Sequence, residues 1–284
     1  MGLARSIIEV ALAQKPVSIY PLHGGMIGDV YRIDMADGQK LVAKTADASS
    51  GTLDVEGYML DYLNKHSSLP VPEVIHSEPA LLIMTFIEGN SHFSDVAEQH
   101  AADLLTALHA ISAPAFGLER DTLIGPLHQP NPLTQSWIDF FRDQRLRYMA
   151  ALAAESSRLP ASLLARIERL AEQLDKWLEE PDQPSLIHGD IWSTNVLATQ
   201  NRITAFIDPA IYYAHAEMEL AYITLFNTFG QAFFERYHTL RPVEPGFFEV
   251  RRHIYNLYPL LVHVRLFGGS YVSAVDQTLR RFGF

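Results

Sequence analysis

One short stretch of the chain, residues 186–197, constrains the fold and the chemistry more than any other. It reads Leu-Ile-His-Gly-Asp-Ile-Trp-Ser-Thr-Asn-Val-Leu, and a later apolar run leads to Phe206-Ile207-Asp208-Pro209. Short apolar runs of this kind predict buried strands, which hold the backbone rigidly. Three polar side chains stand at the ends of these runs and are predicted to project from that scaffold: Asp190, Asn195 and Asp208.

The spacing of these three side chains predicts a chemistry. The pattern Asp-x-x-x-x-Asn, followed by an Asp after the next apolar run, fits the phosphoryl-transfer arrangement of protein kinases. There the first Asp accepts the proton of the attacking hydroxyl, and the Asn and second Asp hold Mg²⁺, a hard cation that prefers oxygen ligands. A His-Gly-Asp turn by itself also fits a purely structural role. The Asn at the required offset and the second Asp favour the catalytic interpretation.

The composition excludes several other classes of function. The 284 residues, 48% hydrophobic and 19% charged, indicate a globular chain with one large domain or two lobes. The chain has no cysteine, which excludes disulfides, thiolate catalysis and Cys-ligated zinc. A net charge of −11 argues against nucleic acid as a general partner. No apolar run approaches the roughly 18 residues of a membrane span, and the start lacks a signal peptide, so the expected location is cytoplasmic.

The first part of the chain predicts a small sheet with a turn that could bind phosphate. A helix is expected over residues 3–13, and two strands then flank the sequence His-Gly-Gly-Met-Ile-Gly at 23–28. Glycines let backbone N–H groups approach phosphate oxygens closely, which is the functional interpretation of Gly24, Gly25 and Gly28. A Gly-Gly turn on its own is more often only a hairpin.

Lys44 ends the next strand and, considered alone, fits a surface lysine with its stem along apolar surface. The following segment, residues 52–66, predicts a helix on which Glu56 shares a face with Leu60 and Leu63. A carboxylate on an apolar face is unfavourable unless it is paired. We therefore predict a Lys44–Glu56 ion pair, the pair that orients the lysine toward the α- and β-phosphates in kinase-like folds.

The continuous apolar run at 81–87 predicts a strand buried on both faces. Glu88-Gly89 follows it as an expected hinge between a small N-terminal lobe, residues 1–87, and a larger helical lobe, residues 88–284. In a kinase-like fold the backbone before this hinge would hydrogen-bond the adenine edge, although the sequence equally fits a plain core strand. The residues concerned are Met84, Thr85, Phe86 and Ile87.

Beyond the hinge the pattern of apolar residues becomes helical. Helical periodicity over 162–179 places Glu172 and Lys176 on the exposed face as an i,i+4 pair. Another helix is expected to begin at a cap on Asp95. His109 lies on the apolar face of that helix and is interpreted as a core histidine with hydrogen-bond partners. The twelve histidines form no metal-binding pattern.

Together these segments resemble the fructosamine (ketosamine) kinase family, a branch of the kinase-like superfamily near aminoglycoside phosphotransferases and choline kinases. Residues 188–195, His-Gly-Asp-Ile-Trp-Ser-Thr-Asn, look like the family's His-Gly-Asp-Leu-Trp-Ser-Gly-Asn. Residues 207–217 are similar to its Ile-Asp-Pro-Ala-Val-Tyr-Tyr-Gly-His-Arg-Glu. Trp192 and the Asp-Pro-Ala-x-Tyr-Tyr run separate the family from protein kinases, which carry Asp-Phe-Gly there. Further segments that fit, over nearly the whole chain, are Phe116-Gly117, Gly125, residues 129–131, Ser136-Trp137, residues 140–146, 260–264 and 266–271.

The resemblance implies a fold and an activity. The fold would be α+β and bilobal, protein-kinase-like, with a small N-terminal antiparallel-sheet lobe carrying one key helix and a larger, mainly helical C-terminal lobe. The activity would be ATP- and Mg²⁺-dependent phosphorylation of a sugar hydroxyl, typically O3, on a ketosamine. That reaction marks glycated amines, free or on a protein, for spontaneous deglycation.

The resemblance also implies a role for individual residues of this chain. Asp190 would be the catalytic base, Asn195 and Asp208 the Mg²⁺ ligands, and Lys44 with Glu56 the phosphate-orienting pair. The nucleotide loop would comprise Gly24, Gly25 and Gly28, and the sugar pocket would be lined by Trp192, His215, Glu217 and His263.

Four positions depart from the family pattern. Met26 stands where many relatives carry a cysteine linked to redox-dependent dimerisation, so we expect a monomer or a dimer without disulfides. Thr194 replaces the usual Gly, and Ala214 and Ala216 replace Gly and Arg beside the expected sugar site, which leaves the preferred substrate open.

Two other functions compete with a ketosamine kinase. One is a small-molecule kinase for a different hydroxyl, of the aminoglycoside or choline type. The other is a pseudokinase that serves as a binding module. A pseudokinase would be expected to lack the lysine, the base or a metal ligand, and this chain retains all of them.

Overall fold

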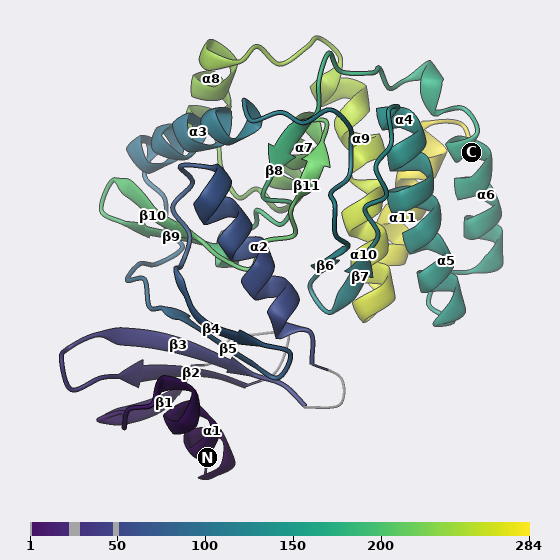
Figure 1. Cartoon of the computed structure of the whole chain (residues 1–284). Coiled ribbons are helices and arrows are strands. Elements are labelled where there is room, and N and C mark those ends of the chain that lie inside the picture. The colour runs from purple at the N-terminus through teal and green to yellow at the C-terminus, as the bar shows by residue number, and fades with distance from the viewer. Residues whose placement is uncertain (1, 23–28, 48–50) are drawn as a thin grey trace.

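The structure is a computed structural model that describes residues 2–22, 29–47 and 51–284. Figure 1 shows a small sheet with helix α1 (Gly2–Leu12) at one end of the molecule and a larger, mainly helical region at the other. Helix α2 (Leu53–His66) lies between the two parts. Within the described ranges, no helix is both long and apolar enough to cross a lipid bilayer.

The small region is built on one five-stranded sheet in which every neighbouring pair is antiparallel. Its spatial order is β1-β2-β3-β5-β4. The strands are β1 (Ser18–Leu22), β2 (Asp29–Asp34), β3 (Lys40–Thr45), β4 (Val74–Glu78) and β5 (Leu81–Thr85). The register places Lys44 opposite Leu82 and Val42 opposite Met84, so the predicted lysine strand lies at the centre of the sheet.

Strand β5 is buried on both faces, as its apolar run predicts. Leu81 and Ile83 join a cluster with Ile8 of α1, whereas Leu82 and Met84 join a cluster with α2 on the opposite face. This alternation follows from the two-residue period of a strand. The two helices therefore cover the two faces of the sheet.

Helix α2 also belongs to the core of the larger region. Leu53 and Leu60 pack on the sheet, while Met59 and Leu63 join the large cluster formed by the C-terminal helices. Leu60 has no exposed surface, and its truncation to Ala would cost roughly 2–5 kcal/mol. Packing on both sides fixes the orientation of α2 relative to both regions.

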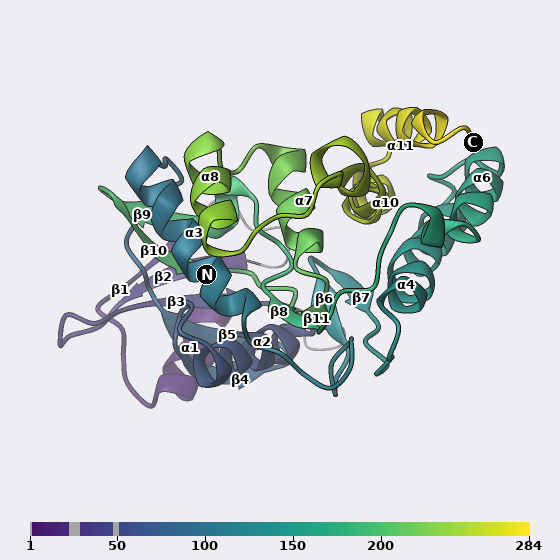
Figure 2. The same cartoon turned by 90° about the horizontal axis from the view of Figure 1, so that it is seen from above.

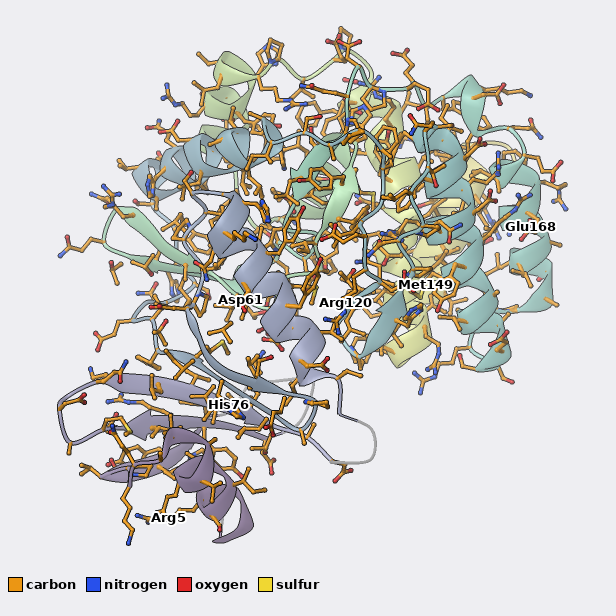
Figure 3. All side chains as sticks on the ribbon, in the orientation of Figure 1. Arg5, Asp61, His76, Arg120, Met149 and Glu168 are labelled. Atoms are coloured by element: carbon orange, nitrogen blue, oxygen red, sulfur yellow. The ribbon has the colours of Figure 1, made fainter. Side chains whose placement is uncertain are left out.

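Polar contacts between α2 and residues 119–120 reinforce this arrangement. Arg120, which Figure 3 shows beside α2, donates to Asp54 at 3.0 Å and lies over the ring of Tyr58 at 4.9 Å. The hydroxyl of Tyr58 donates to Glu119 at 2.8 Å. These contacts join the segment before β6 to the helix that carries Glu56.

The chain passes from the sheet into the large region through residues 86–90. Asn90 pairs with Ala198 in an antiparallel bridge. A Cβ on Gly89 would lie 2.9 Å from both the Leu197 Cβ and the Thr204 Oγ1, so glycine permits this close approach. The connection is thus clamped against the hairpin that precedes Asp208.

The large region contains the remaining helices and three short two-stranded sheets. Figure 2 shows α4, α6, α10 and α11 gathered on the side away from the small sheet. In chain order the elements are α3 (Asp95–His109), β6 (Thr122–Ile124), β7 (Leu127–Gln129), α4 (Trp137–Phe140), η1 (Phe141–Arg147), α5 (Tyr148–Glu155), α6 (Ala161–Ala171), η2 (Leu174–Lys176), β8 (Ser185–Ile187), η3 (Ser193–Asn195), β9 (Val196–Thr199), β10 (Arg202–Phe206), β11 (Tyr212–Ala214), α7 (Glu217–Phe226), α8 (Gln231–Leu240), η4 (Phe247–Arg251), α9 (Arg252–Tyr255), α10 (Leu257–Phe267) and α11 (Ser270–Arg281).

Two local predictions in this region are wrong. The helix expected over 162–179 ends at Ala171, because the backbone leaves helical geometry at Gln173. Glu172 therefore accepts from Arg147, and Lys176 donates to Gln173, in place of the expected pair. Helix α3 is capped one residue earlier than expected, by the Ser94 hydroxyl, which accepts from the Ala97 N–H.

Candidate active site

The turn that presents Asp190 can form only with glycine at its centre. Gly189 has φ of +86°, and a Cβ there would lie 2.2 Å from the carbonyl oxygen of Ala210. The N–H of Ala210 donates to the His188 carbonyl at 2.7 Å. The turn follows the buried strand β8, which pairs with β11, so Asp190 projects from a fixed position.

The hairpin β9–β10 brings Asn195 and Asp208 together. Asn195 immediately precedes β9, and its carbonyl accepts from the N–H of Ile207 at 2.9 Å. Asp208 has a left-handed φ of +54°, which Asp tolerates better than most residues. The hairpin turns near Gln200, which has a left-handed φ of +52°, and it places the two polar residues side by side.

Lys44 bridges the small sheet and the large region. Its Nζ donates to Glu56 at 2.7 Å and to Asp208 at 2.5 Å. The predicted Lys44–Glu56 pair is confirmed, and Asp208 is a second partner. Burial alone would lower the pKa of Lys44, but the charges of Glu56 and Asp208 outweigh it and raise the pKa. The lysine is therefore a fixed cation.

All of these side chains line one cavity of about 120 Å³. It lies where the small sheet, α2 and the hairpin β9–β10 meet. The polar residues on its wall are Lys44, Thr52, Glu56, Asp190, Thr194, Asn195 and Asp208, and Trp192 adds an aromatic side chain. The sequence-predicted base, metal ligands and phosphate-orienting pair are thus brought together.

Both carboxylate oxygens of Asp190 accept hydrogen bonds. The hydroxyl of Tyr222 donates to Oδ1, and Nδ2 of Asn195 donates to Oδ2 at 3.0 Å. Burial raises the pKa of Asp190 to about 7, against the opposing hydrogen bonds from Tyr222 and Asn195. A carboxylate of this pKa suits a general base that works near neutral pH.

A buried hydrogen-bond network anchors the backbone of the turn that carries Asp190. Glu219 of α7 accepts from the N–H groups of His188 at 3.3 Å and Gly189 at 2.6 Å, and it contacts Nε2 of His109 at 2.9 Å. Nδ1 of His109 contacts the hydroxyl of Tyr237 at 2.7 Å. The interpretation of His109 as a core histidine with partners is therefore confirmed.

Glu219 remains ionised although it has almost no exposed surface. Burial raises the pKa of this carboxyl, but the hydrogen bonds from His109 and from the Gly189 N–H outweigh the effect and lower the pKa. A buried carboxylate with this many donors is a rigid support for the turn.

The residues expected to hold the nucleotide are only partly described. Gly24, Gly25 and Gly28 lie outside the described residues. At the expected adenine edge, Met84 is buried against α2. The N–H groups of Thr85 and Phe86 already donate to the carbonyls of Glu73 and Lys40, respectively.

The contact of this backbone with the adenine edge stays a prediction, and the bonded N–H groups limit how it could form. The N–H groups of Thr85 and Phe86 are not available to the adenine. Within the described part of the chain, no hydrogen bond from the Ile87 N–H occurs. Of the four predicted residues, Ile87 is therefore the best placed to donate a backbone hydrogen bond to an adenine.

Two of the four expected sugar-pocket residues lie near Asp190. Trp192 lines the cavity, and its ring lies 5.9 Å from that of Phe226. The ring of His263 also packs against Phe226, at 5.1 Å, as does the ring of Tyr222, at 5.2 Å. Trp192 and His263 therefore belong to one aromatic group that borders the base.

The other two, His215 and Glu217, lie in a separate cavity of about 350 Å³. Glu217 accepts two hydrogen bonds from Arg251, at 2.6 and 2.7 Å, in a buried bidentate pair. Nδ1 of His215 accepts from the Glu217 N–H, and its ring packs near Trp137 and Tyr255. The structure therefore does not bring these two residues together with Trp192 and Asp190, and their role in a sugar pocket stays a prediction.

Two residues of this site have no counterpart in the sequence predictions. Tyr222 and Glu219 are three residues apart on α7 and both contact the turn that carries Asp190. The available signal was the composition of α7, where two acids, Glu217 and Glu219, interrupt an apolar run. Buried carboxylates require partners, but the sequence does not show which ones.

Comparison with known proteins gives consistent relatives over the full length of the chain. The sequence model of the family described as fructosamine kinase matches residues 3–282. A probable ketoamine kinase of Enterococcus faecium is 34% identical over 268 residues, which cover 93% of this chain and 95% of the relative. A probable ketoamine kinase of Vibrio parahaemolyticus is 29% identical and covers 92% and 90% of the two chains.

Solved structures show the same likeness at the level of the fold. A candidate fructosamine-3-kinase from Thermobifida fusca has a TM-score of 0.87 and 28% identity, and the match covers 99% of this chain and 98% of that one. A mutant aminoglycoside phosphotransferase in complex with ADP and hygromycin B has a TM-score of 0.69 over 97% of both chains, and its 18% identity shows the fold alone. The protein thus has a bilobal protein-kinase-like fold, and the chain belongs to the fructosamine kinase family.

Proposed function

We propose that this protein is an ATP-dependent kinase that phosphorylates a sugar hydroxyl of ketosamines. One observation carries the proposal: Lys44, the stretch with Asp190 and Asn195, and Asp208 come from three separate segments and line one cavity. The family membership supports a phosphotransferase that acts on ketoamines. A pseudokinase would have no reason to keep this full set of groups in contact.

Asp190 is proposed as the base that accepts the proton of the attacking hydroxyl. Its carboxylate is partly buried and is oriented by donors on both oxygens. The fixed orientation matters because proton transfer depends on the alignment of the carboxylate lone pair with the hydroxyl. Lys44, held by Glu56, is proposed to place its positive charge against the nucleotide phosphates.

The residues present fit a magnesium ion. Nδ2 of Asn195 donates to Asp190, which leaves the amide oxygen of Asn195 to act as a ligand. The Asp208 side chain lines the same cavity and is 40% exposed. Among the described residues, no group of three or more His, Cys, Asp or Glu could hold a metal ion. A two-oxygen site completed by water and phosphate oxygens suits Mg²⁺. When bound, Mg²⁺ would neutralise charge on the phosphates.

The acceptor is proposed to be a ketosamine, phosphorylated at O3, in a reaction that promotes deglycation. Trp192 and His263 are proposed to border the sugar, because they flank the same aromatic group beside Asp190. We propose that Gly24, Gly25 and Gly28, with Ile87, contact the nucleotide. Residues 1–87 and 88–284 are proposed as the two lobes between which ATP and the acceptor meet.

The test is ADP release by the purified full-length protein with ATP and Mg²⁺. The acceptors are ribulose-, erythrulose- and fructose-modified lysine, an aminoglycoside, choline, and no acceptor. We expect release stimulated by a ketosamine and lost in Asp190→Asn, with the phosphate located on O3 by NMR of the product. Stimulation by the aminoglycoside or choline alone would assign a neighbouring class of small-molecule kinase. ATP binding without release for any acceptor would contradict the proposal.

A further inference from the structure

Tyr222 makes a contact that the proposed chemistry does not yet use. Its hydroxyl donates to Oδ1 of Asp190, the carboxylate assigned above as the base. Tyr222 is only 5% exposed and lies in the middle of α7. Its ring is wedged beside Phe226, 5.2 Å away, which in turn packs against Trp192. The hydroxyl therefore reaches Asp190 from a rigid element rather than from a mobile surface side chain.

The helix that carries Tyr222 is itself joined to the catalytic turn. Glu219 lies one helical turn earlier on α7 and accepts the N–H groups of His188 and Gly189. Residues three apart on a helix share a face, so α7 holds the backbone of the turn with Glu219 and the side chain of Asp190 with Tyr222. The distance between α7 and the turn is thereby fixed.

The Asp190 carboxylate is held from two sides. Asn195 donates to Oδ2 at 3.0 Å and also to the Asp190 backbone carbonyl at 3.1 Å, while Tyr222 donates to Oδ1. A carboxylate oxygen has two lone-pair directions. One donor on each oxygen fixes the plane of the group and still leaves a lone pair free on each.

We propose that Tyr222 is a positioning residue for phosphoryl transfer, whose hydroxyl fixes the plane of the Asp190 carboxylate so that a free lone pair faces the acceptor hydroxyl. This inference rests on the proposed function, in which Asp190 is the base. Tyr222 itself takes no proton from the acceptor. Burial, together with the charge of Asp190, raises the pKa of the phenol, which keeps its proton and remains a donor.

The contact would act mainly in the transition state. Binding of ATP or of the acceptor does not require an aligned base, whereas proton transfer does. An interaction made only in the transition state lowers kcat and kcat/KM equally when it is removed. A residue that merely supports the fold would instead change stability, or would change both KM values.

The test is Tyr222→Phe, which keeps the ring and removes only the hydroxyl. We expect kcat to fall about tenfold, with the KM values for ATP and the ketosamine changed less than twofold. Tyr255→Phe is the matched control, because Tyr255 is also buried and its hydroxyl accepts from Trp137, outside the cavity. The control should keep its kcat. An unchanged kcat in Tyr222→Phe, or equal losses in both variants, would overturn the inference.

Crystal structures of the wild-type protein and Tyr222→Phe provide a second measurement that does not depend on activity. We expect one orientation of the Asp190 carboxylate in the wild-type protein, and a rotated carboxylate or two conformers in the variant. The same single orientation in both would overturn the role of Tyr222. If the wild-type protein phosphorylates no ketosamine, the function proposed above fails, and the crystallographic comparison still decides this inference.

Discussion

Two buried ion pairs of this protein look alike in the sequence and differ in the structure. Lys44–Glu56 and Arg251–Glu217 each join a carboxylate on an apolar helix to a cation from another element. Lys44 is shared with Asp208, whose side chain is 40% exposed. Arg251 instead donates to both oxygens of Glu217 and also to the carbonyls of Pro245 and Glu244.

The difference lies in which group beside each cation remains available to a ligand. The Arg251 guanidinium uses four of its five N–H donors within the fold, and both oxygens of Glu217 are bonded to it, so the pair has little capacity left for a ligand. Lys44 is a compact ammonium with three donors, of which two are occupied by Glu56 and Asp208. Both pairs border a cavity, so what distinguishes Lys44–Glu56 is the further partner Asp208, whose carboxylate is 40% exposed and available to a ligand.

The largest expected effect comes from Asp208→Asn, which changes the partly exposed partner of Lys44. Asn tolerates the left-handed backbone of this position but removes the charge that is proposed to hold Mg²⁺. We expect kcat to fall at least about a thousandfold, or roughly 4 kcal/mol, with the melting temperature nearly unchanged. Asp175→Asn, an exposed acid, is the control. Retention of a tenth of the wild-type kcat would remove Asp208 from the proposed site.

Disruption of the Arg251–Glu217 pair should instead lower the stability of the fold. Arg251→Met leaves Glu217 buried without its partner, and breaking a buried pair costs about 3–5 kcal/mol in the free energy of unfolding. Urea denaturation measures this loss, and kcat of the remaining folded protein should stay within twofold. The exposed Arg236–Asp103 pair provides the control, since Arg236→Met should cost less than about 1 kcal/mol. A large loss of kcat at unchanged stability would reverse the comparison between the two pairs.

An intermediate effect is expected for Glu56→Gln, because Lys44 keeps Asp208 as a partner. The lysine would then be drawn toward Asp208 and away from its position against the phosphates. We expect kcat/KM for ATP to fall about thirtyfold, or roughly 2 kcal/mol, while Glu155→Gln at the surface has no effect. If steady-state kinetics show no difference between these two variants, Glu56 does not orient the lysine.

The smallest expected effect is the contribution of His215, which lies beside the Arg251–Glu217 pair, to the pH dependence of stability. Burial and the charge of Arg251 lower the pKa of His215 to about 3 in the folded protein, whereas an unfolded histidine titrates near 6.5. Below that value the unfolded chain binds a proton that the folded protein does not, so stability falls with decreasing pH. Between pH 7 and 5 we expect His215 to contribute a loss of about 1–2 kcal/mol.

His215→Asn tests this contribution, because the Asn side-chain oxygen can still accept from the Glu217 N–H. Urea midpoints at pH 7 and 5 should differ less in this variant than in the wild-type protein. The exposed His92 serves as the control, and His92→Asn should leave the difference unchanged. An identical pH dependence in all three proteins would exclude His215 as its source.

Local rules were sufficient to predict the parts of the site that depend on short segments. The apolar face of α2 required a partner for Glu56, and the strand before Lys44 placed that lysine within reach. The glycine between His188 and Asp190 permitted a tight turn, and the alternation in β5 placed its side chains on two faces. In each of these cases the physical requirement and the residues that meet it lie close together in the sequence.

The remaining features depend on tertiary packing. Glu217 and Glu56 present the same local signal, and only the position of Arg251, 34 residues further along the chain, assigns Glu217 to the fold. The contact of Tyr222 with Asp190 depends on the orientation of α7. The end of α6 was missed because Gln173 is a good helix former that adopts a non-helical backbone in its tertiary context.

The sequence separation of the contacts of Lys44 has a consequence for folding. The partner Glu56 is 12 residues away, but Asp208 is 164 residues away. The local pair can form when the small sheet and α2 fold, whereas the complete site requires closure of a long loop and docking of the β9–β10 hairpin. A nascent chain that has not yet released this hairpin from the ribosome has no assembled site. Recovery of activity would therefore mark the last stage of folding, after most helical structure has already formed.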